Sequence, residues 1–183
     1  MALLKSINVQ LGTKAIDFCL KGIDGAMHSL ADYDAKDVLV IVIMCNHCPY
    51  VHAVDDRLVL LQEKFAERNV QLVGINPNDG IKYPDDNFEN MVKRAEEKGY
   101  NFPYLRDEDQ SIAKKYQAQC TPDIYVYNKE RELCYHGQID DNWQHPEKVT
   151  SHDLSDAIEA LLGGGKPSPD QYPSMGCSIK WKG

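Results

Sequence analysis

The segment 38–51 reads Val-Leu-Val-Ile-Val-Ile-Met-Cys-Asn-His-Cys-Pro-Tyr-Val, and the rest of the chain is interpreted around it. Its first seven residues are all apolar and rich in Val and Ile, which predicts a strand over 38–44 that is covered on both faces of a sheet. After Tyr50 the apolar residues recur at helical spacing, which predicts a helix over about 49–68. The Cys-x-x-Cys pair therefore falls where a central strand meets the N-terminus of a helix.

This position favours a thiolate at the first cysteine. A cysteine reacts as its anion, and the free N–H groups and dipole of a helix N-terminus stabilise negative charge. We therefore expect a lowered pKa for Cys45, at the outer end of the turn, and expect Cys45 to be the nucleophile. His47 either adds a second favourable charge as an imidazolium or points to solvent. Cys48, about one turn further in, is expected to resolve the mixed disulfide.

Length and charge narrow the class of protein. A chain of 183 residues predicts one domain with a small appendage. The net charge is −8 and there is no basic run, so nucleic acid is not an expected partner. The acidic groups at 85–86, 107–109 and 140–141 are expected to be solvated surface.

The expected compartment is the cytoplasm. No stretch is apolar and long enough for a signal peptide or a membrane span, so we expect no membrane partner. A stable disulfide framework is not expected in that compartment, so we expect the Cys-x-x-Cys to be catalytic or metal-binding.

The sequence also predicts the environment of other cysteines and tyrosines. Cys19 and Cys134 lie in apolar contexts and are expected in the core, and the tyrosines at 125, 127 and 135 are expected on the sheet surface.

The remaining pattern predicts further elements in a β-α-β order. A second buried strand at 70–75 follows the first helix, which implies a parallel pair with the strand at 38–44. We expect a β-hairpin from 16–18 and 26–30, a strand at 102–105, a second hairpin from 124–127 and 132–136, and helices at 85–98, 110–116 and 151–162, the last with Ser151 as N-cap. A Gly/Pro-rich linker begins at residue 163, so we divide the chain into a domain at 1–162 and a linker and C-terminal tail at 163–183.

This order of elements resembles the thioredoxin-like fold, an α/β fold with a central mixed β-sheet flanked by helices, here with an N-terminal β-hairpin and a C-terminal tail. The dipeptide Thr121-Pro122, just before a hairpin strand, supports the resemblance. In thioredoxin-like proteins the proline at this place is cis and faces the Cys-x-x-Cys, and the backbone of the preceding residue pairs with substrate. The resemblance implies these substrate-binding roles for Thr121 and Pro122.

Other stretches resemble the peroxiredoxin-like branch of that superfamily, the alkyl hydroperoxide reductase/thiol-specific antioxidant (redoxin) group. They are Ala15-x-Asp17-Phe18-x-Leu20-x4-Gly25-x3-Ser29-Leu30, the motif at 46–51 and the tail at 176–181. Two features depart from its relatives. Asn46-His47 replaces the Gly-Pro of reducing thioredoxins, and a histidine before the second cysteine is shared with more oxidising proteins such as protein disulfide isomerase. A peroxiredoxin carries Thr or Ser three residues before its peroxidatic cysteine, whereas Cys45 stands three residues before Cys48.

Three functions follow from the sequence. The first is a thiol–disulfide oxidoreductase that exchanges a Cys45–Cys48 disulfide with protein or small-molecule thiols, draws on a reductant such as thioredoxin or glutathione, and needs no organic cofactor. Asn46 and His47 would set its reduction potential. The second is a thiol-dependent peroxidase, in which peroxide oxidises Cys45 or Cys48 and either Cys120 or Cys177 resolves. The third is a non-catalytic module in which the pair holds a metal ion, although no second Cys-x-x-Cys supplies the four ligands that zinc prefers.

Overall fold

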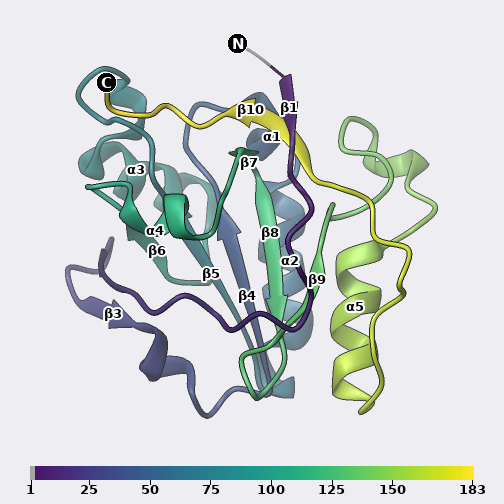
Figure 1. Cartoon of the computed structure of the whole chain (residues 1–183). Coiled ribbons are helices and arrows are strands. Elements are labelled where there is room, and N and C mark those ends of the chain that lie inside the picture. The colour runs from purple at the N-terminus through teal and green to yellow at the C-terminus, as the bar shows by residue number, and fades with distance from the viewer. Residues whose placement is uncertain (1–2) are drawn as a thin grey trace.

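A seven-stranded mixed sheet forms the centre of the computed structural model, which describes residues 3–183 (Figure 1). From one edge to the other its strands are β3 (Met27–Ser29), β2 (Cys19–Gly22), β6 (Tyr104–Arg106), β5 (Val70–Asn76), β4 (Val38–Ile43), β8 (Asp123–Tyr127) and β9 (Leu133–His136). Strand β4 pairs parallel with β5 and antiparallel with β8. The parallel pair is confirmed, and so are both hairpins, β2–β3 and β8–β9.

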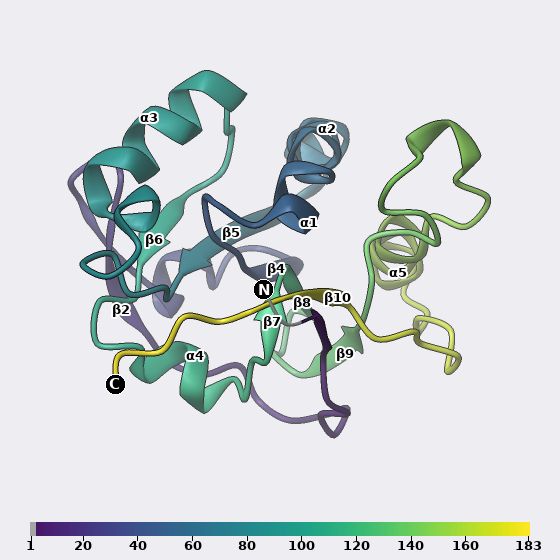
Figure 2. The same cartoon turned by 90° about the horizontal axis from the view of Figure 1, so that it is seen from above.

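Helices cover both faces of this sheet. They are α1 (Pro49–His52), α2 (Asp55–Phe65), α3 (Phe88–Lys98), α4 (Ser111–Lys115) and α5 (Asp153–Leu162). Figure 2 shows α2, α3 and α5 on one side of the sheet and α4 on the other. Alternate residues of β4 enter two separate cores: Val38, Val40 and Val42 lie in the core with α2 and α5, and the residues between them lie in the core with α4. This two-sided burial explains why the strand is apolar throughout.

Some expected boundaries and environments differ from the structure. The helix expected over 49–68 is divided into α1 and α2, and α5 has His152 rather than Ser151 at its N-cap. The Ser151 hydroxyl instead donates to the Asp153 carboxylate, at 2.7 Å. Cys19 is exposed, contrary to the prediction of a core residue. The tyrosines at 125, 127 and 135 are buried rather than on the surface, because both faces of β8 and β9 are covered.

The prediction for the acidic groups is wrong at three positions. Asp86, Asp107 and Asp140 are buried. Asp107 accepts the backbone N–H of Ala113 at the start of α4 at 2.8 Å, and Asp140 pairs with Arg57. These carboxylates are therefore internal hydrogen-bond acceptors. The other acidic residues of the three groups are exposed, as expected.

The C-terminal tail folds back over the large sheet. A second, three-stranded sheet has the order β1 (Leu3–Lys5), β10 (Met175–Ser178) and β7 (Cys120–Thr121), and β10 is antiparallel to both neighbours. In Figure 1 the yellow strand β10 crosses above the end of β4. The division of the chain at residue 163 stays a prediction. Among residues 3–183, no helix has both the length and the apolar character needed to cross a bilayer.

Gly176 allows β10 to lie against the turn at Thr121. A Cβ atom at this position would lie 1.9 Å from the Thr121 carbonyl oxygen and 2.6 Å from its carbonyl carbon. Both are backbone atoms, which have little freedom to move away. Only glycine therefore fits where the tail crosses the strand.

We predict that Gly176→Ala separates β10 from β7. Overpacking of this kind costs about 1–3 kcal/mol, so amide hydrogen exchange over residues 175–178 should accelerate about five-fold or more. Gly183→Ala is the matched control, because no atom of the described chain lies within 4 Å of its Cβ position. Unchanged protection of the tail in Gly176→Ala would contradict this account of the crossing.

Candidate active site

The two cysteines of the motif lie together at the end of β4, and both are completely buried. The Cys45 sulfur is 3.3 Å from the Thr121 hydroxyl oxygen, and the Cys48 thiol donates to the Thr121 carbonyl oxygen at 3.1 Å. The Thr121–Pro122 peptide bond is cis. The structure therefore brings Cys45, Cys48, Thr121 and Pro122 together. All six cysteines are free thiols.

The pairing of β4 with β8 explains this meeting. Ile43 at the end of β4 lies opposite Asp123 at the start of β8. Because the strands are antiparallel, the chain leaving β4 and the chain entering β8 occupy the same edge of the sheet. Cys45 is two residues beyond Ile43, and Thr121 is two residues before Asp123. The strand register thus sets the distance between the thiols and Thr121.

The electrostatics of the pair differ from the sequence expectation. Burial raises the pKa of Cys45 well above its usual value, helped by the hydrogen bond it donates to Cys48 and by the Asp86 carboxylate. The pKa of Cys48 is lowered, chiefly because the Cys45 thiol donates to it, and this outweighs burial. Cys48 is also the N-cap residue of α1, with its sulfur near the N–H of Val51. The neighbouring thiols, more than the helix N-terminus, therefore favour a thiolate at Cys48, and the prediction of a lowered pKa at Cys45 is wrong.

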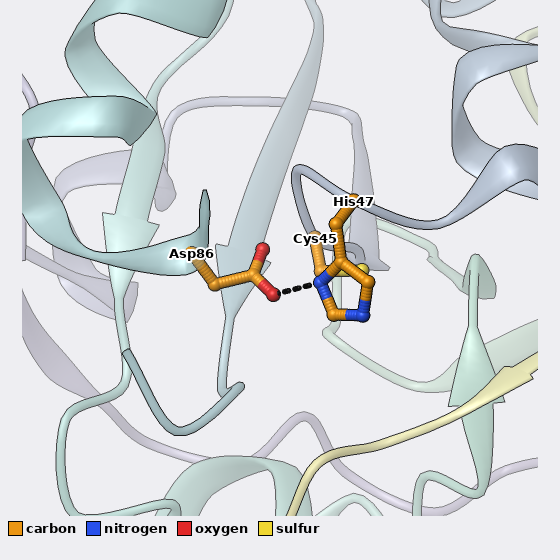
Figure 3. Close-up of side chains that lie close together, drawn as sticks. All are labelled: Cys45, His47 and Asp86. Carbon is orange, nitrogen blue, oxygen red and sulfur yellow. Dashed lines mark hydrogen bonds and ion pairs between the residues drawn. The ribbon is translucent and has the colours of Figure 1, made fainter. Parts of the chain in front are cut away.

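His47 is held by a buried carboxylate. Its Nδ1 atom contacts Asp86, whose side chain is fully buried (Figure 3). The hydrogen bond to Asp86 raises the pKa of His47 and outweighs the opposing effect of burial. Burial alone would raise the pKa of Asp86, but hydrogen bonds from His47, Asn78 and the Asn46 N–H lower it. His47 and Asp86 therefore form an ion pair beside the thiols, and His47 does not simply point to solvent.

Asn46 holds the turn between the two cysteines in place. Its backbone N–H donates to Asp86 at 2.6 Å, and its side-chain amide donates to the Asp85 carbonyl at 2.7 Å. Its side-chain oxygen accepts the Tyr104 hydroxyl at 2.9 Å, and its carbonyl oxygen contacts the His52 ring. With each of these polar groups satisfied, Asn46 fixes the conformation of the turn rather than facing a substrate.

A metal ion would have to compete with this network. The ligand atoms of Cys45, His47 and Asp86 lie within 4.8 Å of one another. However, the two Asp86 oxygens already accept hydrogen bonds from His47, from the Asn46 N–H at 2.6 Å, from Asn78 at 2.9 Å and from Asn76 at 3.3 Å. Metal binding would break several of these bonds, and structural zinc sites take four ligands. The donor set therefore fits a hydrogen-bonded positioning site better than a metal centre.

The other two candidate cysteines lie near the pair but differ in orientation. Cys177 in β10 is directly opposite Thr121 and shares a core cluster with Cys45 and Cys48. Cys120 is buried and precedes Thr121 in the same strand, so its side chain points to the other face. Its thiol contacts the Pro122 carbonyl oxygen, at 3.6 Å. Cys177 is therefore the better placed of the two to react with the Cys-x-x-Cys.

Four residues that hydrogen-bond around the turn between Cys45 and Cys48 were not predicted from the sequence. These are Asn76, Asn78, Asp86 and Tyr104. The sequence did indicate two of them, because Asn76 ends β5, the strand parallel to β4, and Asn78 follows two residues later. The carboxyl ends of parallel strands meet at one edge of a sheet, so these side chains were bound to lie near Cys45. Asp86 carried no comparable signal.

A small cavity lies beside the cis proline. It has a volume of about 110 Å³, and its lining includes Tyr50, Pro122, Ile139, Trp143 and Met175. Tyr50 and Trp143 pack against each other, with their ring centroids 4.1 Å apart. Small-molecule sites usually span ~300–1,000 Å³, so this cavity is smaller than a typical small-molecule site.

Comparisons with solved structures place this geometry among related proteins. The chain is 43% identical to an uncharacterized conserved protein from Geobacillus kaustophilus, with a TM-score of 0.94 over 100% of this chain and 97% of that chain. It is 38% identical to the hypothetical protein SMc02350 from Sinorhizobium meliloti 1021, with a TM-score of 0.93 over 97% of this chain and 98% of that one. A thiol:disulfide interchange protein of the thioredoxin family from Chlorobium tepidum TLS shares the fold at 17% identity, with a TM-score of 0.59 over 71% and 87% of the two chains.

A search of the curated proteins gives no match. A family model does match, over residues 11–136, and it is the model of the AhpC/TSA family. The matched region contains the Cys-x-x-Cys and the cis proline that meets it. It also contains all seven strands of the large sheet, together with β7 of the smaller one. The chain therefore belongs to the AhpC/TSA family, with a thioredoxin-like fold.

Proposed function

We propose that this chain is a thiol–disulfide oxidoreductase that cycles Cys45 and Cys48 between a dithiol and a disulfide. The observation that carries the proposal is the meeting of both sulfurs with Thr121 at the cis proline, at 3.3 and 3.1 Å. Thiol chemistry also agrees with the family to which the chain belongs. Its substrates are protein or small-molecule thiols and disulfides. We further propose a reductant such as thioredoxin or glutathione, and a cytoplasmic location.

The difference in pKa between the two thiols assigns their roles in exchange. In the oxidising direction a substrate thiolate attacks the Cys45 sulfur, and Cys48 leaves as the thiolate because its pKa is the lower one. The product is a mixed disulfide between substrate and Cys45. A second substrate thiol then attacks the substrate sulfur and releases Cys45 as a thiol. The substrate loses two electrons, which the Cys45–Cys48 pair gains.

The reverse sequence reduces a substrate disulfide. Cys45 forms the mixed disulfide, and the Cys48 thiolate attacks the Cys45 sulfur to release the product. These are the roles that the sequence predicts for nucleophile and resolving residue, although the stabilised charge lies on Cys48. Because β10 occupies the open edge of Thr121, we propose that a substrate pairs with Thr121 and Pro122 when β10 is displaced.

A thiol-dependent peroxidase is the second candidate, and the family match is the observation that favours it. In that case peroxide would oxidise Cys48, whose thiolate is the more stable, to a sulfenic acid. The neighbouring thiol of Cys45 or Cys177 would then form a disulfide and release water. Exchange remains the better supported function, because two cysteines lie together at Thr121 and Cys45 occupies the position at which a peroxiredoxin carries Thr or Ser.

We predict that, in a Cys177→Ser background, Cys45→Ser and Cys48→Ser each abolish exchange between the oxidised protein and a peptide dithiol, because each removes one sulfur of the disulfide and the neighbouring Cys177 thiol is absent. The measurement is stopped-flow oxidation of the peptide, with the products identified by mass spectrometry. Cys134→Ser is the matched control, since this half-buried thiol donates only to the Glu132 carbonyl, at 3.3 Å. Exchange that survives both substitutions, or rapid consumption of peroxide without dithiol exchange, would contradict the proposal.

The ion pair of His47 and Asp86 gives a prediction for pH. A raised pKa at His47 stabilises the fold fully below the unfolded value of ~6.5, and this contribution disappears as pH rises through the folded pKa. A lowered pKa at Asp86 stabilises above the unfolded value of ~3.9, and this contribution disappears as pH falls through the folded pKa. The pair should therefore stabilise the protein most between about pH 4 and 6.5.

We expect Asp86→Asn to lose most stability in that window and to lower the pKa of His47. Denaturant unfolding across pH and NMR titration of the His47 ring measure the two effects. His28→Asn is a control, because it removes a histidine paired with the exposed Asp24 at 2.9 Å. If the His47 titration were unchanged in Asp86→Asn, Asp86 would not be what raises its pKa.

A further inference from the structure

The tail strand places a third thiol against the Cys-x-x-Cys. In the ladder between β10 and β7, Cys177 lies directly opposite Thr121, and Ser178 lies opposite Cys120. Side chains of directly opposed residues share one face of an antiparallel pair. Since the Thr121 hydroxyl lies 3.3 Å from the Cys45 sulfur, that face is the one toward the motif. Cys177 therefore points to the two reactive thiols, and Cys120 points away from them.

The sulfurs of Cys45 and Cys48 both lie against Thr121, the residue that Cys177 faces across the ladder. The Cys45 sulfur is 3.3 Å from the Thr121 hydroxyl oxygen, the Cys48 sulfur is 3.1 Å from the Thr121 carbonyl oxygen, and the neighbouring Cys45 and Cys177 thiols both lower the pKa of Cys48. All three side chains belong to one buried cluster, with exposures of 0%, 0% and 3% for Cys45, Cys48 and Cys177. A bond from Cys48 to either neighbour therefore needs only a small movement within an ordered site, which is the condition for a high effective concentration.

We infer that Cys177 is a third redox cysteine of this site and takes over the disulfide at the Cys48 sulfur. The inference rests on the proposed function, which supplies the Cys45–Cys48 disulfide. The Cys177 sulfur attacks the Cys48 sulfur, the Cys48–Cys177 bond forms and the Cys45–Cys48 bond breaks. Cys45 leaves and takes up the proton that Cys177 gives up. The number of disulfides is conserved, so no external oxidant or reductant takes part.

The exchange has a structural consequence at Thr121. A Cys48–Cys177 disulfide fixes β10 covalently over the backbone edge that a substrate would use, and it returns Cys45 to the thiol form. A Cys45–Cys48 disulfide leaves β10 held only by its strand pairing and packing. The two isomers therefore correspond to a closed site and a site that can open.

The first experiment isolates the new disulfide in Cys45→Ser, in which the motif pair cannot form. The full-length variant is equilibrated at low protein concentration with a glutathione/glutathione disulfide buffer, alkylated and mapped by peptide mass spectrometry. We expect an intramolecular Cys48–Cys177 disulfide, in at least about ten-fold excess over any disulfide that contains Cys120, because only Cys177 is oriented toward Cys48. A stable glutathione adduct on Cys48 with a free Cys177, or a Cys48 disulfide only between molecules, would overturn the inference.

Wild type and two further variants complete the test and keep it separate from the proposed function. Wild type should yield both the Cys45–Cys48 and the Cys48–Cys177 peptides, which also covers the case in which Cys45→Ser fails to fold. Cys177→Ser should yield only the first, and Cys120→Ser should leave the ratio of the two unchanged. Wild type with Cys45–Cys48 alone overturns the role of Cys177 and leaves the proposed function standing. Wild type without Cys45–Cys48 overturns the proposed function, whatever Cys177 does.

Discussion

The contact between Thr121 and two buried sulfurs is the interaction on which this site depends. Thr121 meets one sulfur through its hydroxyl and the other through its carbonyl oxygen. The same residue forms the short strand that receives the tail, and the cis peptide bond follows it. The register of β4 against β8 brings Thr121 to this place, because it aligns the end of one strand with the start of the other. Any shift of that register would separate the thiols from Thr121.

The two thiols differ in pKa because their buried surroundings differ. Cys45 is enclosed beside the Asp86 carboxylate, which disfavours its thiolate. The neighbouring Cys45 and Cys177 thiols lower the pKa of Cys48, which directly precedes α1. His47 offsets the charge of Asp86 instead of acting on the thiolate alone. The dipeptide between the cysteines therefore acts through its contacts, with Asn46 fixing the turn and His47 neutralising the carboxylate.

Much of the fold was predictable because its strands carry a strong local signal. The apolar run at 38–44, the strand at 70–75 and the hairpin at 124–136 appear where the pattern places them, whereas the first strand of the N-terminal hairpin is at Cys19–Gly22 rather than at 16–18. Neighbouring residues in a sequence can still have opposite environments: Asp85 is exposed, whereas Asp86 is buried and holds His47. Only the tertiary structure, which closes α3 and its preceding turn over the motif, distinguishes them. The alternation at 124–127 likewise could not show that both faces of β8 are covered.

The position of the C-terminal tail was even less predictable from the sequence. The Gly/Pro-rich linker is compatible with many positions of the tail. From the sequence alone, Cys177 could contact either its own chain or a second copy. Gly176 and the pairing of β10 with β7 select a single position, in which Cys177 lies opposite Thr121 and in the same buried cluster as Cys48. The site thus combines a motif that sequence identifies with partners that only the structure assembles.

The midpoint potential of the Cys45–Cys48 couple tests the central claim most directly, measured in glutathione buffers with peptide mass mapping. Stabilisation of the thiolate at Cys48 favours the reduced form, so we predict a reversible couple at about −200 mV or above, more oxidising than the ~−270 mV of thioredoxin. A potential near that of thioredoxin or below would contradict the stabilisation at Cys48. Two thiols that never pair would contradict disulfide exchange altogether.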